Sequence, residues 1–178
     1  MKIAPLILIF LFFAHLTFGQ IGLNGFHWVP FDNIPCNNFR MYQEIQWTWT
    51  PDGLAVEPTR QADGNYDTWL NTAKKKGIEI VFCPNRVPNW WYTPEQRQSD
   101  GEWPDRRLHR WGGKGTDPRE YYDICQYYWQ LTARYGREKY DGSMLFVNAK
   151  PRWNNDPVTK KLSGLNLLNY LEVENEPD

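Results

Sequence analysis

The sequence predicts an α/β domain whose core is a parallel sheet. Two observations lead to this prediction: four short segments have the character of strands, and helical segments follow the second and third of them. Strands that alternate with helices indicate a parallel sheet with right-handed crossovers. Nothing in the sequence repeats at a fixed short period, which argues against a solenoid.

Four segments are predicted to form the strands of this sheet. The first two are Leu23–Val29 and Asn38–Tyr42, and the link between them is too short for a full helix. The third, Ile78–Phe82, is an apolar run rich in β-branched residues, as expected for a strand buried on both faces. The fourth, Tyr170–Glu174, follows an irregular stretch over residues 137–168.

The first predicted helix spans residues 65–76. Its apolar side chains follow helical spacing, and Gly77 supplies the stop signal. After the third strand, a loop rich in Trp, Gly, Pro and Arg runs from Pro84 to Thr116. Loops of this length in compact domains are usually functional, so we expect this one to contribute to a binding surface.

The second predicted helix begins after Asp117 and ends at Gly136. Asp117 can cap it, Pro118 suits its first turn, and Glu120 is expected to complete a capping box. The stripe of side chains expected to face the core is Tyr121, Ile124, Cys125, Tyr128, Leu131, Thr132 and Tyr135.

The first 19 residues have the layout of a secretory signal peptide. A lysine near the start precedes an apolar run over residues 6–16, and small residues lie just before Gln20. The run is shorter than the roughly 20 residues that a transmembrane helix needs. We therefore expect cleavage near Gln20, no stable membrane insertion afterwards, and a secreted, periplasmic or cell-surface protein. An uncleaved signal that anchors a structural protein is the alternative.

Charge and cysteine content exclude several classes of function. A net charge of −1 offers no long-range attraction for nucleic acid. The three cysteines, Cys36, Cys83 and Cys125, cannot all pair with one another. We expect Cys83 and Cys125 to be small buried residues. The cysteine and histidine spacing fits no zinc site, so we expect neither a metal nor a cofactor.

The most specific motif ends the chain, where Asn175, Glu176 and Pro177 follow the fourth predicted strand. It resembles the fourth-strand signature of the clan of retaining TIM-barrel glycoside hydrolases that includes cellulases, mannanases and β-xylosidases. The resemblance implies a (β/α)8 TIM barrel, of which residues 20–178 are the N-terminal half, truncated after the fourth strand. It implies a polysaccharide or oligosaccharide substrate, Glu176 as general acid/base, and Asn175 as the residue that holds the sugar 2-hydroxyl.

Retaining hydrolysis needs a second carboxylate, about 5–5.5 Å from the first. The resemblance places this nucleophile after a seventh strand, beyond Asp178, so we expect residues 1–178 alone to lack normal hydrolase activity. Strand C-termini of such a barrel open onto the active-site face, which suits an acid at Glu176. Alternation puts Glu172 and Glu174 on one side of the strand. Each is either a paired or solvent-linked structural carboxylate or, for Glu174, a catalytic group.

Other candidates for substrate binding follow or lie within the earlier strands and the long loop: Arg40, Asn85, His27, Trp28, Trp90 and Trp91. Arg40 resembles the second-strand Arg that steadies the nucleophile in parts of the clan, and an ordinary ion pair is the alternative. The rings of the two loop tryptophans can stack on the apolar face of a pyranose or can plug the top of a barrel.

The segment from Trp103 to Trp111 interleaves basic and aromatic residues. Such a segment can bind nucleic acid, but the balanced net charge favours an acidic polysaccharide held through Arg106 and Arg107. The rival to the hydrolase is a non-catalytic secreted carbohydrate-binding protein, in which aromatic loops supply the affinity and Glu176 is structural.

Overall fold

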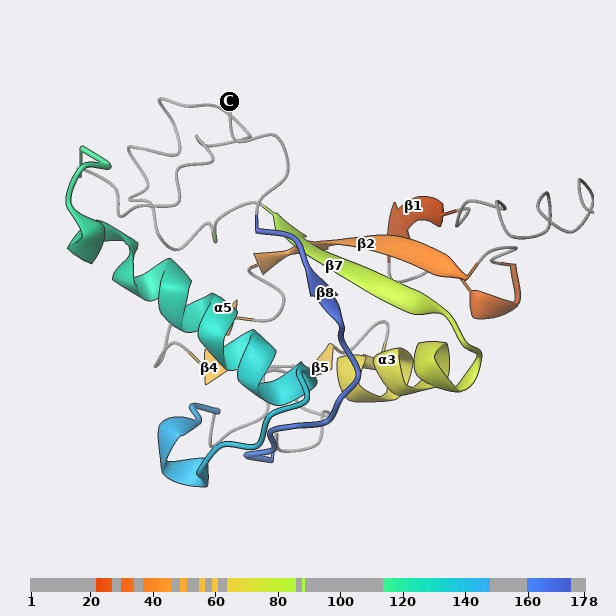
Figure 1. Cartoon of the computed structure of the whole chain (residues 1–178). Coiled ribbons are helices and arrows are strands. Elements are labelled where there is room, and N and C mark those ends of the chain that lie inside the picture. The colour runs from red at the N-terminus through yellow and green to blue at the C-terminus, as the bar shows by residue number, and fades with distance from the viewer. Residues whose placement is uncertain are drawn as a thin grey trace, which may run out of the picture.

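The computed structural model describes residues 22–26, 30–33, 37–45, 49–50, 55–56, 59–60, 64–85, 88, 114–147 and 160–173. Within them, a four-stranded parallel sheet packs against two α-helices (Figure 1). The strands, in their order across the sheet, are β1 (Gly22–Phe26), β2 (Asn38–Glu44), β7 (Glu79–Asn85) and β8 (Tyr170–Leu171). The helices are α3 (Tyr66–Lys75) and α5 (Tyr122–Tyr135).

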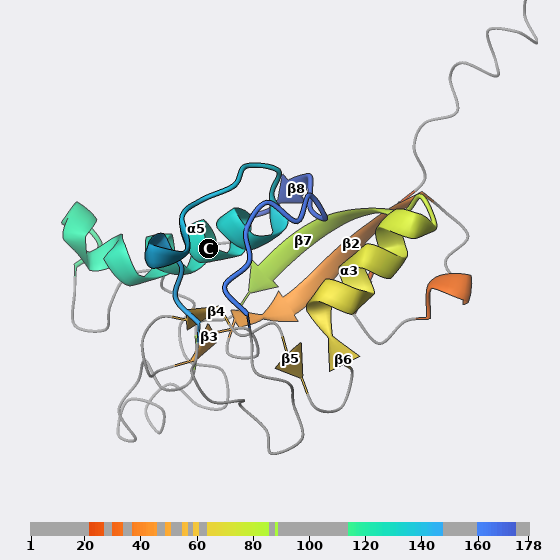
Figure 2. The same cartoon turned by 90° about the horizontal axis from the view of Figure 1, so that it is seen from below.

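Shorter elements fill the connections. Two antiparallel hairpins lie between β2 and α3, and Figure 2 shows them at the end of the sheet where β2 and β7 finish. They are formed by β3 (Trp49–Thr50) with β4 (Ala55–Val56) and by β5 (Thr59–Arg60) with β6 (Gly64–Asn65). The 3-10 helices are η1 (Phe31–Asn33), η3 (Pro118–Tyr121) and η4 (Gly142–Met144).

The predicted parallel sheet is confirmed, although the strand boundaries differ. β7 extends to Asn85, because the ladder with β2 continues through the Gln43–Pro84 and Glu44–Asn85 pairs. The predicted loop therefore begins later than Pro84. β1 ends at Phe26, and the rest of the predicted first strand, residues 27–29, lies outside the described residues. β8 is shorter than predicted, and Glu174 is likewise outside.

Both helices cover the same face of the sheet. Alternate residues of β2 and β7, namely Phe39, Met41, Ile80 and Phe82, are buried in one cluster with side chains of α3 and α5. Because neighbouring strand residues point to opposite faces, Arg40 and its neighbours two residues along lie on the face turned away from this core. The sheet thus has an apolar face under the helices and a second face with polar side chains.

Helix α3 confirms the first predicted helix to within one residue at each end. Tyr66, Leu70 and Ala73 are its buried residues, and they have the predicted helical spacing. Gly77 follows with φ of +70°, a backbone conformation in which glycine has no steric penalty. The stop signal in the sequence therefore corresponds to a left-handed residue in the structure.

Helix α5 buries a face rotated from the predicted one. Its buried residues are Asp123, Ile124, Tyr127, Gln130, Leu131, Ala133, Arg134 and Tyr135. Cys125 and Thr132 are exposed, so their predicted burial is wrong, whereas Cys83 is buried as predicted. The predicted stripe left out the three buried polar side chains, Asp123, Gln130 and Arg134, and also the buried Tyr127 and Ala133.

The start of this helix also differs from the predicted capping box. Asp117 accepts a hydrogen bond from the Arg119 amide at 3.0 Å and caps η3, which precedes α5. The Glu120 carboxylate bonds instead to the amides of Gly115 and Lys114, at 2.7 and 3.3 Å. The predicted box is therefore wrong, because Glu120 turns to the preceding loop, whose amides it satisfies.

The segment 160–168 runs along the end of α5 and leads into β8. The amides of Leu167 and Leu168 both donate to the Tyr135 carbonyl, at 2.8 and 3.0 Å, and Gly164 donates to Ala133 at 3.0 Å. These bonds satisfy carbonyls that a helix C-terminus leaves unpaired.

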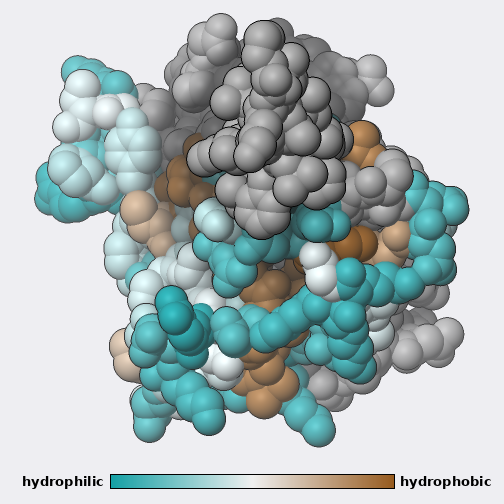
Figure 3. Space-filling model, turned by 45° about the vertical axis from the view of Figure 1, so that its right-hand side comes forward, coloured by the Kyte–Doolittle hydropathy of each residue, from teal (hydrophilic) through white to brown (hydrophobic). Residues whose placement is uncertain are grey.

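On the side of the molecule drawn in Figure 3, hydrophilic residues surround smaller hydrophobic patches. No helix within the described ranges has the length and apolar character to cross a membrane.

Candidate functional site

Arg40 and Glu172 form a bidentate ion pair on the polar face of the sheet. Arg40 Nε donates to Glu172 Oε2 at 2.5 Å, and Nη2 donates to Oε1 of the same carboxylate. The two side chains are 24% and 29% exposed. Paired N–H groups that meet both oxygens of a carboxylate form one of the stronger kinds of ion pair in proteins.

Strand register explains why two residues so distant in sequence meet. Arg40 on β2 pairs with Val81 on β7, which pairs with Tyr170 on β8. Glu172 lies two residues past Tyr170 on the same face, and its amide donates to the Phe82 carbonyl at 2.9 Å. The long Arg40 side chain therefore reaches along the face, across β7, to the carboxylate.

Tyr42 and Cys83 surround this pair. Arg40 Nη1 donates to the Tyr42 hydroxyl, and the guanidinium carbon lies 4.8 Å from the centre of the Tyr42 ring. Tyr42 and Cys83 are register partners on β2 and β7. The buried Cys83 thiol also hydrogen-bonds to the Glu172 carboxylate. The cluster of Arg40, Tyr42, Cys83 and Glu172, here called the Arg40 cluster, spans three strands.

Hydrogen bonding within the Arg40 cluster fixes its charges. The bonds to Glu172 raise the pKa of Arg40, and the bonds from Arg40 lower the pKa of Glu172. Glu172 is therefore ionised at neutral pH, so it can balance charge and accept hydrogen bonds but cannot donate a proton. Of the two interpretations that the sequence left open for Arg40, the structure shows an ion pair, and Glu172 is the paired carboxylate.

The other predicted site residues are only partly described. Asn85 is the last residue of β7 and the register partner of Glu44, but only its backbone is described. The candidates that lie outside the described residues are His27, Trp28, Trp90, Trp91, Glu174, Asn175 and Glu176. Cys36 and the segment 103–111 also lie outside them. Among the described residues, no group of three or more His, Cys, Asp or Glu side chains could hold a metal ion.

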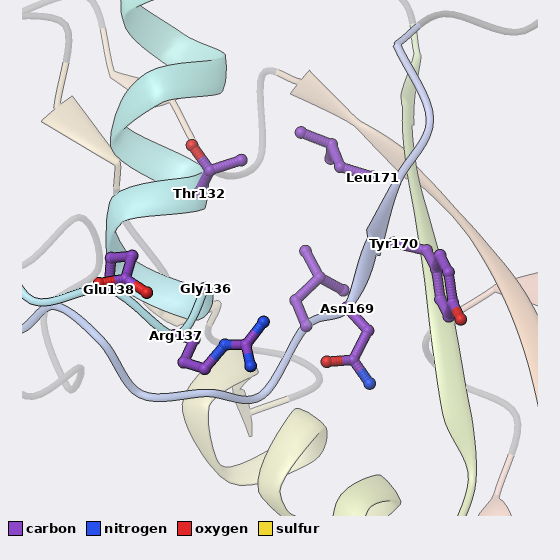
Figure 4. A pocket seen from close by; sticks show the side chains of 8 residues that line it. Thr132, Gly136, Arg137, Glu138, Asn169, Tyr170 and Leu171 are labelled. Atoms are coloured by element: carbon purple, nitrogen blue, oxygen red, sulfur yellow. The ribbon is translucent and has the colours of Figure 1, made fainter.

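Two of the pockets that described residues line lie away from the Arg40 cluster. One, of about 300 Å³, opens between the end of α5 and β8 (Figure 4). Arg137 lies on one side of it and Asn169 on another, with Thr132 and Leu171 facing each other above them. A second, of about 230 Å³, lies between the end of α3 and the start of β7. Arg40 lines neither pocket.

The sequence analysis missed Tyr42 and Cys83 as partners of the ion pair. Tyr42 follows Arg40 by two residues in a strand, and this spacing places both on one face. That signal was present in the sequence, whereas the contact of Cys83 with Glu172 depends on the β7–β8 register.

Compared with protein-family models, with curated proteins and with solved structures, the chain gives no match.

Proposed function

We propose that this chain is part of a secreted glycoside hydrolase that cleaves O-glycosidic bonds of a polysaccharide or oligosaccharide by a retaining mechanism. In this proposal, residues 20–178 form the first half of a TIM barrel, and Glu176 is the general acid/base. The observation that carries it is the position of the Asn175-Glu176-Pro177 triplet in the sequence, four residues after the fourth strand of a parallel sheet ends at Leu171.

The order of the strands supports the barrel. The sheet order β1-β2-β7-β8 is the order of these strands along the chain, and both helices pack on one face. A TIM barrel has this arrangement, with strands added consecutively and all helices outside. A doubly wound sheet reverses its strand order and places helices on both faces. The described residues have no such reversal.

The polar face of the sheet also supports the proposal. In a TIM barrel, the face turned away from the helices lines the barrel, and the C-terminal ends of the strands form the active site. The Arg40 cluster lies on that face, and the chain leads from Glu172 toward Asn175 and Glu176. Because Arg40 keeps Glu172 ionised, we assign proton donation to Glu176 and charge balance to Glu172.

The proposed chemistry needs two carboxyl groups. Glu176 protonates the glycosidic oxygen as the bond to the leaving group breaks, while a carboxylate about 5–5.5 Å away attacks the anomeric carbon. The first residue then deprotonates the water that hydrolyses the glycosyl-enzyme intermediate. We assign the attacking carboxylate to a residue outside 1–178. We also propose that Asn175 binds the sugar 2-hydroxyl.

The test compares Glu176→Gln with Glu172→Gln in the polypeptide encoded by the complete reading frame. Both variants are assayed against polysaccharides and a series of aryl glycosides whose leaving groups differ in pKa. Loss of a general acid matters least when the leaving group needs no proton. Glu176→Gln should therefore lose activity by about 10²–10⁴-fold on poor leaving groups and recover on good ones.

The Glu172→Gln variant is the matched control, because it makes the same chemical change four residues earlier. Its loss should not depend on the leaving group, since Glu172 donates no proton. Equal leaving-group dependence in both variants would refute the assignment of the acid. If the wild-type protein binds glycans but cleaves none of them, the non-catalytic binding protein replaces the hydrolase.

A further inference from the structure

The four-stranded sheet has two outer edges, one along β1 and one along β8. Within the described ranges, no other strand pairs with either of them. The backbone N–H and C=O groups of an edge strand form a template for a further strand, and parallel sheets are rarely left open to solvent. The two edges therefore favour a partner of one kind, which is an extended strand.

One hydrogen bond shows which backbone groups of β8 face outward. The Glu172 amide donates to the Phe82 carbonyl of β7 at 2.9 Å. Successive residues of a strand direct their N–H and C=O groups to opposite sides, so those of Leu171 point away from β7. They lie where a further parallel strand would form its ladder with β8.

The two edges also match in their apolar side chains. Leu23 on β1 is the register partner of Phe39, so it lies on the face of the sheet that carries the helices, yet it is 40% exposed. On the other edge, Leu171 packs against the core on that same face and lines the pocket of about 300 Å³ beside the end of α5 (Figure 4). One edge thus has an exposed leucine, and the other has a pocket beside a leucine.

A second copy of the chain fits both edges at once. All four strands run parallel, and both helices lie on one face. When β1 of one copy pairs in parallel with β8 of another, the sheet continues with its helices on that same face. A two-fold axis along the strands repeats this junction, and a barrel of about eight strands has an interior that side chains can fill. The Arg40 cluster of each copy then faces the interior.

We propose that the chain forms a two-fold dimer in which β1 of each copy pairs with β8 of the other. Leu23 of one copy packs into the pocket next to Leu171 of the partner subunit. The proposal does not rest on the proposed hydrolase, so a lack of hydrolase activity leaves it intact. Because a strand from further along a longer polypeptide would compete for the same edge, the test uses the chain of residues 1–178.

The first measurement is sedimentation equilibrium of this chain over a range of concentrations. The wild type should reach the mass of two chains and no more, because two junctions close the ring. Leu23→Asp removes a buried leucine from both junctions, so it should raise the dissociation constant of the dimer by about 10²–10⁴-fold. Leu162→Asp is the matched control, because Leu162 is also 40% exposed but lies outside the sheet. It should leave the dissociation constant unchanged.

Two substitutions at Leu171 test the backbone pairing. Leu171→Pro removes the N–H that points outward, and proline is tolerated on an edge strand where that N–H faces away from the sheet. Leu171→Ala also shortens the side chain but keeps the N–H. Leu171→Pro should therefore dissociate the dimer more than Leu171→Ala does. Circular dichroism establishes that each variant is folded.

Mixing two variants gives a result that only complementary edges explain. Leu23→Asp keeps a normal β8 edge and Leu171→Pro keeps a normal β1 edge, so a mixed pair regains one intact junction. The mixture should associate where neither variant alone does, and a variant that failed to fold would not restore association. A wild type with the mass of one chain at every concentration would overturn the proposal. So would larger, open-ended assemblies, or a dimer that Leu23→Asp leaves intact.

Discussion

Replacing Arg134 with Met should destabilise the fold more than any exposed charge change. Arg134 on α5 is 5% exposed, and its Nε and Nη2 donate to the two oxygens of Asp67 on α3 at 2.9 and 2.5 Å. Its Nη1 donates to the Lys160 carbonyl at 2.8 Å. One side chain therefore joins two helices and the segment that leads into β8.

The expected loss can be worked out from this geometry. Removing one partner of a buried ion pair costs about 3–5 kcal/mol, because the other charge stays in the interior without compensation. The Asp67 side chain is 25% exposed, so water can partly solvate its charge. We therefore expect Arg134→Met to lower the free energy of unfolding by about 3 kcal/mol. Urea unfolding followed by tryptophan fluorescence measures this difference.

Two further variants decide whether the ion pair is the cause. Asp67→Leu combined with Arg134→Met removes both charges and should recover most of the lost stability. Arg119→Met is the matched control, since Arg119 also pairs with an aspartate but is 90% exposed, and it should leave the unfolding midpoint unchanged. The reasoning fails if Arg134→Met costs less than about 1 kcal/mol or if the double variant is less stable than the single one.

The Arg40 guanidinium lowers the pKa of Glu172 in the folded state. The ion pair therefore contributes its full stability at pH values above the ordinary glutamate pKa of about 4.3. This contribution is lost as the pH falls through the lower pKa of Glu172 in the folded protein. The difference in unfolding midpoint between wild type and Glu172→Gln should therefore shrink on acidification, and a constant difference would contradict the pairing. Iodoacetamide should label exposed Cys125 in the native protein and buried Cys83 only after unfolding, as mass spectrometry of the peptides would show. Gly164→Ala should lower the melting temperature more than Gly77→Ala. Both glycines have positive φ, but a Cβ on Gly164 would lie 2.7 Å from Lys139 Cγ, whereas a Cβ on Gly77 would meet nothing within 4 Å.

The sequence predicted the elements with strong local patterns. Apolar periodicity and Gly77 located α3 to within a residue at each end, and the apolar run of β7 identified a buried strand. The hairpins β3–β4 and β5–β6 were missed because strands of two residues have no period to detect. A helix or strand is thus predictable from the sequence when the apolar residues that it buries recur at a regular spacing.

The contacts of the candidate site were harder to predict for a different reason. Arg40 and Glu172 are 132 residues apart, and Asp67 and Arg134 are 67 apart. No local pattern marks a charged residue as buried when its partner comes from another element. The burial of Arg134 on α5 is such a case, because its partner Asp67 lies on α3. Arg40 was singled out by resemblance, but its partner emerged only from strand register.

The Arg40 cluster is better explained by a role on its face of the sheet than by stability. Partly exposed ion pairs contribute little to stability, and in buried ones desolvation offsets the Coulomb attraction. If a second layer of apolar elements packed on this face of the sheet, apolar side chains at positions 40 and 172 would stabilise it better than an ion pair does. Polar groups tied across three strands instead suit a face that receives polar ligands or other charged side chains. The pairing with Arg40 also holds Glu172 in place, four residues before the proposed acid Glu176 in the sequence.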